Sequence, residues 1–151
     1  MERDVRELYD AAQGRHGVDE IEFCGIIFNR SDAEIRQIAD AYRQHHRHHL
    51  DAVIHTEFSG HVQHALLYAV EGALNPMGRD ARLIEHALLD ADYQAEKLAY
   101  RLIRAYWKGG ERYLQSIKHA YQERYHRNLI RHIENHMSGH FMQLLVALLE
   151  G

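Results

Sequence analysis

The sequence contains two copies of one pattern, displaced by 79 residues, which is the separation of Ile38 and Ile117. The matched positions are mostly apolar residues at helical spacing, so the two copies are expected to share one packing plan. Each copy also contains a Ser-Gly pair, whose serine can cap the helix that follows. The matched residues of the first copy are Ile38, Ala41, Tyr42, Leu50, Ile54, Ser59, Gly60, His61, Leu66, Glu71 and Gly72.

Each copy is predicted to form five helices. In the first copy, Val5 and Leu8 begin an apolar stripe, and the stretch 19–28 is apolar on most faces, which is typical of a buried helix. Ser31 and Glu34 have the spacing of a capping box that opens the third helix. The other helices are expected around 50–54 and 59–70 in the first copy, and around 84–88, 98–106, 114–121, 129–133 and 141–149 in the second.

No stretch alternates apolar and polar residues with the period of a strand, so the sequence predicts an all-α protein. The run Asn75-Pro76-Met77-Gly78 is typical of a break between units. We therefore expect one unit at 1–74, a linker at 75–78 and a second unit at 79–151.

The composition excludes several classes of protein. The chain has 151 residues, one proline, one cysteine and a formal net charge of −4, without the basic field that drives nucleic-acid binding. Cys24 has no partner for a disulfide, which favours a reducing compartment. The charged start and the lack of a long apolar run predict neither a secretory signal nor a membrane span, and hence a cytoplasmic protein.

No catalytic motif is found in the sequence. It has no glycine-rich phosphate loop, no zinc-type cysteine spacing and no nucleophile elbow. Cys24 lies in the most apolar predicted helix, where an inert thiol is expected rather than a nucleophile. The sequence therefore predicts a protein that is not an enzyme.

Short motifs follow one another in the first copy, namely Gly17-Val18-Asp19-Glu20, Arg30-Ser31, Tyr42 and Glu57-Phe58-Ser59-Gly60. Their order and spacing resemble the annexin repeat. The resemblance implies five-helix units in which four helices form a bundle and the third helix lies across them. It also places the loops that bind calcium on one face. It also implies docking on acidic phospholipid membranes, with the protein peripheral to the membrane.

The two copies are similar to different annexin repeats. The first copy, with Arg15-His16-Gly17, is most similar to the third of the four repeats in a conventional annexin. The second copy, with Leu102-Ile103-Arg104 and Trp107, is similar to the fourth repeat of fungal annexins. We therefore expect half of a four-repeat annexin, which would leave apolar surface to be covered by a homodimer or by another annexin half.

The resemblance implies a calcium site in the first copy. Calcium takes about six to eight oxygen ligands, and backbone carbonyls of a tight loop together with one distant carboxylate can supply them. By resemblance, the ligands are the carbonyls of Ala12, Arg15 and Gly17 and the side chain of Glu57. The alternative is that Glu57 is a solvated acid and Gly17 only ends a helix; Val18, where the family pattern has threonine, is a departure.

The second copy departs further from this pattern. Its matching loop contains Asp90 and Asp92, and His136 stands at the carboxylate position. An imidazole cannot act as a bidentate carboxylate, so we expect a degenerate site that binds calcium weakly. The alternative is that the two acids cap the helix that follows.

Fourteen histidines are the unusual feature of the composition. His45, His46, His48 and His49 could ligate a metal, although adjacent histidines in a loop usually form an adventitious site. His132, His136 and His140 are candidates for a pH switch that attracts anionic lipid below about pH 6, with solvated polar residues as the alternative.

Two functions follow from these observations. The first is calcium-dependent binding to acidic phospholipid membranes through the loop at Gly17. The second is a calcium-independent helical scaffold with degenerate sites, which could bind membranes through its histidines in a pH-dependent way.

Overall fold

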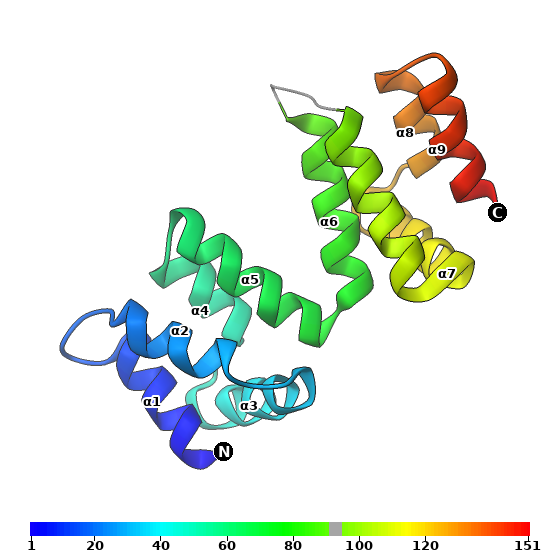
Figure 1. Ribbon diagram of the computed structural model, residues 1–151. Helices are drawn as coiled ribbons and strands as arrows, with labels where there is room; N and C mark the ends of the chain where they lie inside the picture. Colours follow the sequence, from blue (N-terminus) through cyan, green and yellow to red (C-terminus); the bar gives the residue numbers. More distant parts are fainter. Residues whose placement is uncertain (91–94) are drawn as a thin grey trace. The chain divides into compact units, whose positions relative to one another are not determined.

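The computed structural model describes residues 1–90 and 95–151, and the described residues form helices and no strand. The chain divides into two compact units, Met1–Pro76 and Met77–Gly151. The first unit contains α1 (Glu2–Gln13), α2 (Glu20–Phe28), α3 (Asp32–His46), α4 (Leu50–Glu57) and α5 (Gly60–Leu74) (Figure 1). The second contains α6 (Pro76–Leu89), α7 (Ala95–Tyr125), α8 (Leu129–His136) and α9 (His140–Glu150).

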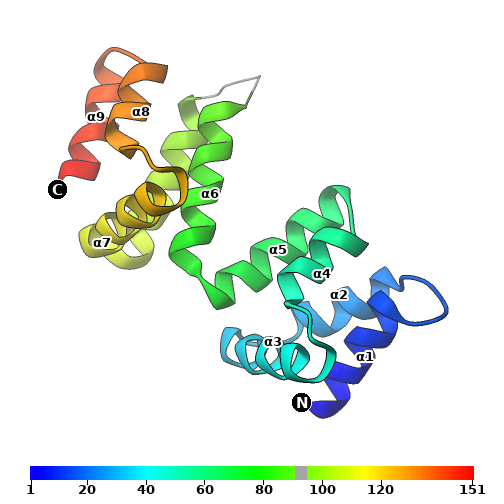
Figure 2. The ribbon, with the colours of Figure 1, turned by 180° about the vertical axis from the view of Figure 1, so that it is seen from behind.

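In the first unit, four helices surround one core and α3 crosses them. Both ribbon views show α3 nearly end-on while α1, α2, α4 and α5 are seen from the side (Figures 1 and 2). The core contains Phe23, Ile27, Tyr42 and Ile54, which are all fully buried. The predicted arrangement of a bundle with a covering helix is confirmed.

Local capping sets the ends of these helices. The Ser31 side chain accepts from the Glu34 amide, and the Glu34 carboxylate accepts from the Ser31 amide, so the predicted capping box is present. The Asp19 side chain caps α2 in the same way by accepting from Glu22. At the other end of α3, Arg47 adopts a left-handed backbone with φ +63° and stops the helix.

The second unit repeats this plan around its own core. The long helix α7 is interrupted at Gly110, whose φ of +69° is not helical, so it corresponds to the two helices predicted at 98–106 and 114–121. The Asn128 side chain caps α8 by accepting from the Arg131 amide. His126 has a left-handed φ of +56° at the position that matches Arg47, so the two copies turn in the same way.

Two details differ from the expectations. The residues Pro76, Met77 and Gly78 of the expected linker form the first turn of α6, where proline is tolerated because its missing N–H would have no helical partner. The helix α2 is not buried on all faces, since Ile21 is 88% exposed and Phe28 is 52% exposed. Its nine residues turn one side to the core and leave the other apolar side uncovered.

Among the described residues, no helix combines the length and the apolarity that crossing a bilayer requires. Cys24 is half-buried in α2, and burial raises the pKa of its thiol. A raised pKa leaves little thiolate at neutral pH, as expected for an unreactive cysteine.

Candidate calcium loop and buried polar network

The loop between α1 and α2 contains the predicted calcium ligands of the first unit. Gly17 has φ +85°, a left-handed conformation that glycine adopts without strain. The Asp19 amide donates to the Ala11 carbonyl at 2.7 Å, which closes the loop against the end of α1. Arg15 and Gly17 are exposed in this loop, whereas Ala12 is in the last turn of α1 and is 3% exposed.

Glu57 is the last residue of α4 and is half-buried. Tyr42 contacts the end of α1, since its hydroxyl donates to Gln13 Oε1 at 2.7 Å. Burial, together with the nearby groups Tyr9 and Glu57, raises the pKa of Tyr42. Among the described residues, no hydrogen bond or ion pair joins the Glu57 side chain to the loop.

A pocket of about 450 Å³ lies beside the loop, between the end of α1 and the loop backbone. Of the predicted ligands, only Arg15 lines it; Asp10 and Gln13, which the sequence did not indicate, are also in its wall. No group of three His, Cys, Asp or Glu side chains among the described residues could hold a metal. A calcium site here would thus depend on carbonyl oxygens, which are available because the last four carbonyls of a helix lack helical partners.

The corresponding loop of the second unit is arranged differently. Asp90 forms an ion pair with Lys97 at 3.1 Å, so its carboxylate already has a cation. Asp92 lies outside the described residues. His136 is at the end of α8, where its Nδ1 atom is 2.9 Å from the carbonyl oxygen of His132.

The second unit also contains a buried polar network, which the sequence did not indicate. Glu85 on α6 and Tyr121 on α7 are 3% and 0% exposed. The Tyr121 hydroxyl contacts Glu85 Oε2 and lies 2.5 Å from Nδ1 of His132 on α8, and Arg127 forms an ion pair with Glu85. A signal was available, because His132 lies between Leu129 and Ile133 on the apolar stripe of α8.

The network fixes the tautomer of His132. Glu85 is ion-paired with Arg127, and a charged carboxylate can only accept, so the Tyr121 hydroxyl donates to it. The Nδ1 atom of His132 must then carry the hydrogen that it donates to the Tyr121 oxygen. Burial, followed by the effects of Arg127 and His136, lowers the pKa of His132 to about 4.

The three histidines proposed for a pH switch therefore differ. His132 is 8% exposed and, with a pKa of about 4, stays neutral at pH 5. His136 and His140 are exposed residues at the end of α8 and the start of α9. His132 is therefore not suited to the proposed switch, for which His136 and His140 stay candidates.

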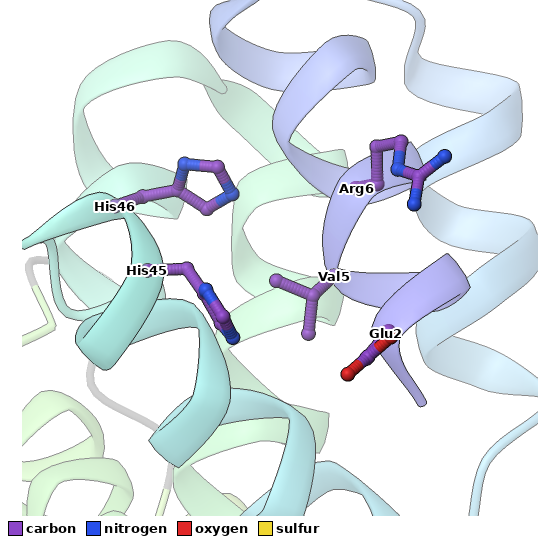
Figure 3. Close-up of a pocket in the computed structure, with 5 residues that line it drawn as sticks. All are labelled: Glu2, Val5, Arg6, His45 and His46. Carbon is purple, nitrogen blue, oxygen red and sulfur yellow. The ribbon is translucent and has the colours of Figure 1, made fainter.

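His45 and His46 of the first unit lie beside a second pocket, of about 350 Å³ (Figure 3). His45 and His46 reach from α3 toward Glu2, Val5 and Arg6 on α1. His46 stacks on Tyr9 with ring centroids 4.0 Å apart, and burial lowers the pKa of His46. His46 thus helps to pack α3 against α1.

A model of the annexin family matches residues 3–69 and 80–148. Annexin C1 of Cryptococcus neoformans is 35% identical over 153 residues, which cover 99% of this chain and 32% of that protein. Mouse annexin A13 is 34% identical over 147 residues, which cover 97% of this chain and 45% of that protein. The chain thus spans about a third to a half of the length of these relatives.

Solved structures agree with this comparison. Annexin III superimposes with a TM-score of 0.82 at 26% identity, over 99% of this chain and 45% of that structure. Chicken annexin V gives a TM-score of 0.79 at 28% identity, over 98% of this chain and 44% of that structure. The family match in both copies confirms the resemblance seen in the sequence, and the chain belongs to the annexin family.

Proposed function

We propose that this chain binds acidic phospholipid membranes in a calcium-dependent way through the loop between α1 and α2. The observation that carries the proposal is the turn after α1, in which Gly17 has φ +85° and the Asp19 amide donates to the Ala11 carbonyl. Arg15 and Gly17 are exposed in this turn, so their carbonyl groups belong to a surface loop that a cation can approach. Membership of a family known for calcium-dependent phospholipid binding supports the same function.

The donor chemistry fits a calcium ion. Calcium prefers oxygen ligands and tolerates irregular geometry, so carbonyls of an exposed turn and one carboxylate form an acceptable set. We assign the carbonyls of Ala12, Arg15 and Gly17 and the Glu57 side chain to this set. Calcium bound there would keep open positions, which lipid phosphate oxygens could fill.

We assign calcium binding to the first unit only. In the second unit, Lys97 neutralises Asp90, and the side chain at the carboxylate position is His136. At these two positions, which are the described part of the expected site, no anionic oxygen is free to bind a cation. One functional site per chain would make membrane affinity modest unless two chains bind together.

Sedimentation with phosphatidylserine vesicles over a calcium titration tests the site. Glu57→Gln should abolish calcium-dependent sedimentation, because an amide is a weaker calcium ligand than a carboxylate. The matched control is Glu134→Gln, which removes one exposed acid from α8. Equal sedimentation of both variants and the unmodified chain would reject Glu57 as a ligand, and absence of calcium heat in calorimetry would favour the calcium-independent scaffold.

We further propose that an exposed apolar face of α7 is covered by a second copy of this chain. Tyr100, Ile103 and Trp107 share one side of the helix and are 55%, 37% and 81% exposed. The relatives are about two to three times as long as this chain. Their additional residues could cover such a face within one chain, whereas here we assign that role to a second copy. Light scattering should show a dimer that Trp107→Glu dissociates, and a monomer mass at high concentration would contradict this proposal.

A further inference from the structure

The corner between α7 and α8 forms a pocket of about 460 Å³ that has no acidic side chain in its wall. Two arginines, two histidines and three side-chain amides line it. The basic residues are His126, Arg127, Arg131 and His132. A concave surface lined by basic side chains and without an acid favours an anionic ligand.

The positive charge of this pocket is only partly neutralised. Arg127 is already paired with Glu85. Among the described residues, no carboxylate forms an ion pair with Arg131 or His126, and both side chains are exposed. Arg131 therefore supplies a guanidinium that is free to bind an anion, and the geometry of guanidinium suits phosphate oxygens in particular.

A buried side chain in the wall adds a specific requirement. His132 is 8% exposed, its Nδ1 atom is held by Tyr121, and its Nε2 atom has no hydrogen-bond partner among the described residues. Because Nδ1 carries the hydrogen, Nε2 is an acceptor, and a hydroxyl of a ligand in the pocket can donate to it. A ligand that matches the pocket thus has negative oxygens for Arg131 and a hydroxyl for Nε2.

We propose that this pocket binds a phosphate group that carries or adjoins a hydroxyl. Hydrogenphosphate has both kinds of atom, and so does the headgroup of a phosphorylated inositol lipid, whose ring hydroxyls adjoin the phosphate. Sulfate at neutral pH has the charge but no hydroxyl. The N-terminus of α8, capped by Asn128 at the edge of the pocket, adds a favourable partial charge.

The site belongs to the second unit alone. The positions that match Arg131 and His132 are Ala52 and Val53 in the first copy, so the free cation and the buried imidazole are both missing there. The pocket between α1 and α3 of the first unit has both Glu2 and Arg6 in its wall, together with His45 (Figure 3). The charge of Glu2 offsets that of Arg6, so this pocket lacks the acid-free wall of the pocket in the second unit.

The pocket is also separate from the calcium chemistry. It runs along α8 from Asn128 to Asn135, in the unit to which we assign no calcium site. None of its wall residues is among the proposed calcium ligands, which all belong to the first unit. Phosphate binding here therefore needs no calcium and can be measured with a chelator present, so its failure would leave the proposed calcium site untouched.

The test uses the full chain, labelled with ¹⁵N, in chelator at pH 7. Sodium phosphate and sodium sulfate are titrated separately at constant ionic strength, and the amide shifts of Arg131 and His132 are followed. We expect saturable shifts with phosphate and clearly weaker binding of sulfate. Arg131→Gln should weaken phosphate binding about tenfold, since it removes a charge-assisted hydrogen bond.

Two further variants sharpen the test. Arg112→Gln removes one exposed arginine from α7 outside the pocket and should leave phosphate binding unchanged. His126→Asn removes the imidazole, and asparagine tolerates the left-handed backbone at this position, where φ is +56°. This variant should weaken phosphate binding less than Arg131→Gln does. Absence of saturable shifts, or equal weakening by the Arg112 and Arg131 variants, would overturn the proposal.

The source of the phosphate is decided by vesicles that contain phosphatidylinositol 4-phosphate, again in chelator. Sedimentation that Arg131→Gln abolishes would support the site with a lipid headgroup as its ligand. Phosphate shifts in solution without such sedimentation would support the site with a soluble phosphate as its ligand.

Discussion

The Nδ1 atom of His132 lies 2.5 Å from the hydroxyl oxygen of Tyr121, inside the core of the second unit. The same hydroxyl contacts Glu85, so one tyrosine links α6, α7 and α8 through a single oxygen. In the first unit, the matched Tyr42 donates to Gln13 and the residue matched to His132 is Val53. The two copies thus keep the same tyrosine and surround it with different polar groups.

The buried imidazole makes the stability of the second unit depend on pH. The pKa of His132 is about 4 in the folded chain and about 6.5 when unfolded, so the unfolded chain binds more protons between these values. The stabilisation is therefore complete above pH 6.5 and is lost as the pH falls toward 4, by about 3 kcal/mol. Urea unfolding at several pH values should show this loss, and NMR titration of the imidazole gives the pKa directly.

The matched variant His132→Val places the residue of the first copy at this position. This variant should remove most of the pH dependence of the free energy of unfolding. The remainder comes from other groups, including His46, whose pKa is also lowered. If the variant and the unmodified chain lose stability equally between pH 6.5 and 4, the buried neutral imidazole is not the cause.

Removing the two matched hydroxyls should have unequal costs. Tyr121→Phe leaves buried Glu85 with one donor fewer and His132 without its acceptor, and we expect a loss of about 2–3 kcal/mol. Tyr42→Phe frees only Gln13, which is half-buried and can turn to water, so the expected loss is about 1 kcal/mol. Urea unfolding of both variants measures the difference, and equal costs would show that the network adds nothing.

The local features of the fold could be read from the sequence. The capping box of Ser31 and Glu34 depends on residues three apart, and its pattern sufficed to predict it. Two helices at 98–106 and 114–121 were likewise expected from two apolar stripes, and the structure places the break between them at Gly110. The exposed side of α2 could not be predicted. A short helix with apolar residues on all sides has no apolar stripe that would indicate which face is buried.

The polar network could not be predicted from local patterns. Glu85 and Tyr121 are 36 residues apart, and only the packing of α6 on α7 brings them together. A lone histidine on a helix gives no sign of which partner it has, so His132 was grouped with exposed His136 and His140. For the calcium loop, the residues were assigned by resemblance, and the hydrogen bond from Tyr42 to Gln13 at the end of α1 needed the structure.

The arginine of the Arg-Ser motif has a structural role that can be tested. Arg30 donates from Nε and Nη2 to both oxygens of Asp4, at 2.8 and 2.9 Å, which ties the end of α2 to α1. Arg30→Lys keeps the charge and loses the paired geometry, so we expect a loss of about 1 kcal/mol. Arg3→Lys changes an exposed partner of Glu7 and should cost almost nothing.

The carboxyl group reports on the same contact. The hydrogen bonds from Arg30 lower the pKa of Asp4 from its ordinary value of 3.8, despite the opposing effect of burial. In Arg30→Lys this pKa should rise toward 3.8, which NMR titration of the Asp4 side chain can follow. An unchanged pKa would mean that the bidentate pair does not persist in solution.

Two glycines of the first unit should respond to alanine in opposite ways. Gly17 has φ +85° and an added Cβ would meet no atom within 4 Å, so its substitution costs only the strain of a left-handed alanine, about 1 kcal/mol. Gly25 is an exposed residue inside α2 with the same open space, and alanine there should stabilise the unit by about 0.5–1 kcal/mol. Urea unfolding gives both signs.

The two substitutions also separate stability from calcium binding. Because the Gly17 carbonyl is one of the proposed ligands, Gly17→Ala should weaken calcium binding in calorimetry by shifting the loop backbone toward negative φ. Gly25→Ala alters the same unit outside the loop and should leave calcium affinity unchanged. The double variant, Gly17→Ala with Gly25→Ala, should regain the stability lost at Gly17 but not the calcium affinity. If its calcium affinity also recovers, the conformation of the loop is not what determines calcium binding.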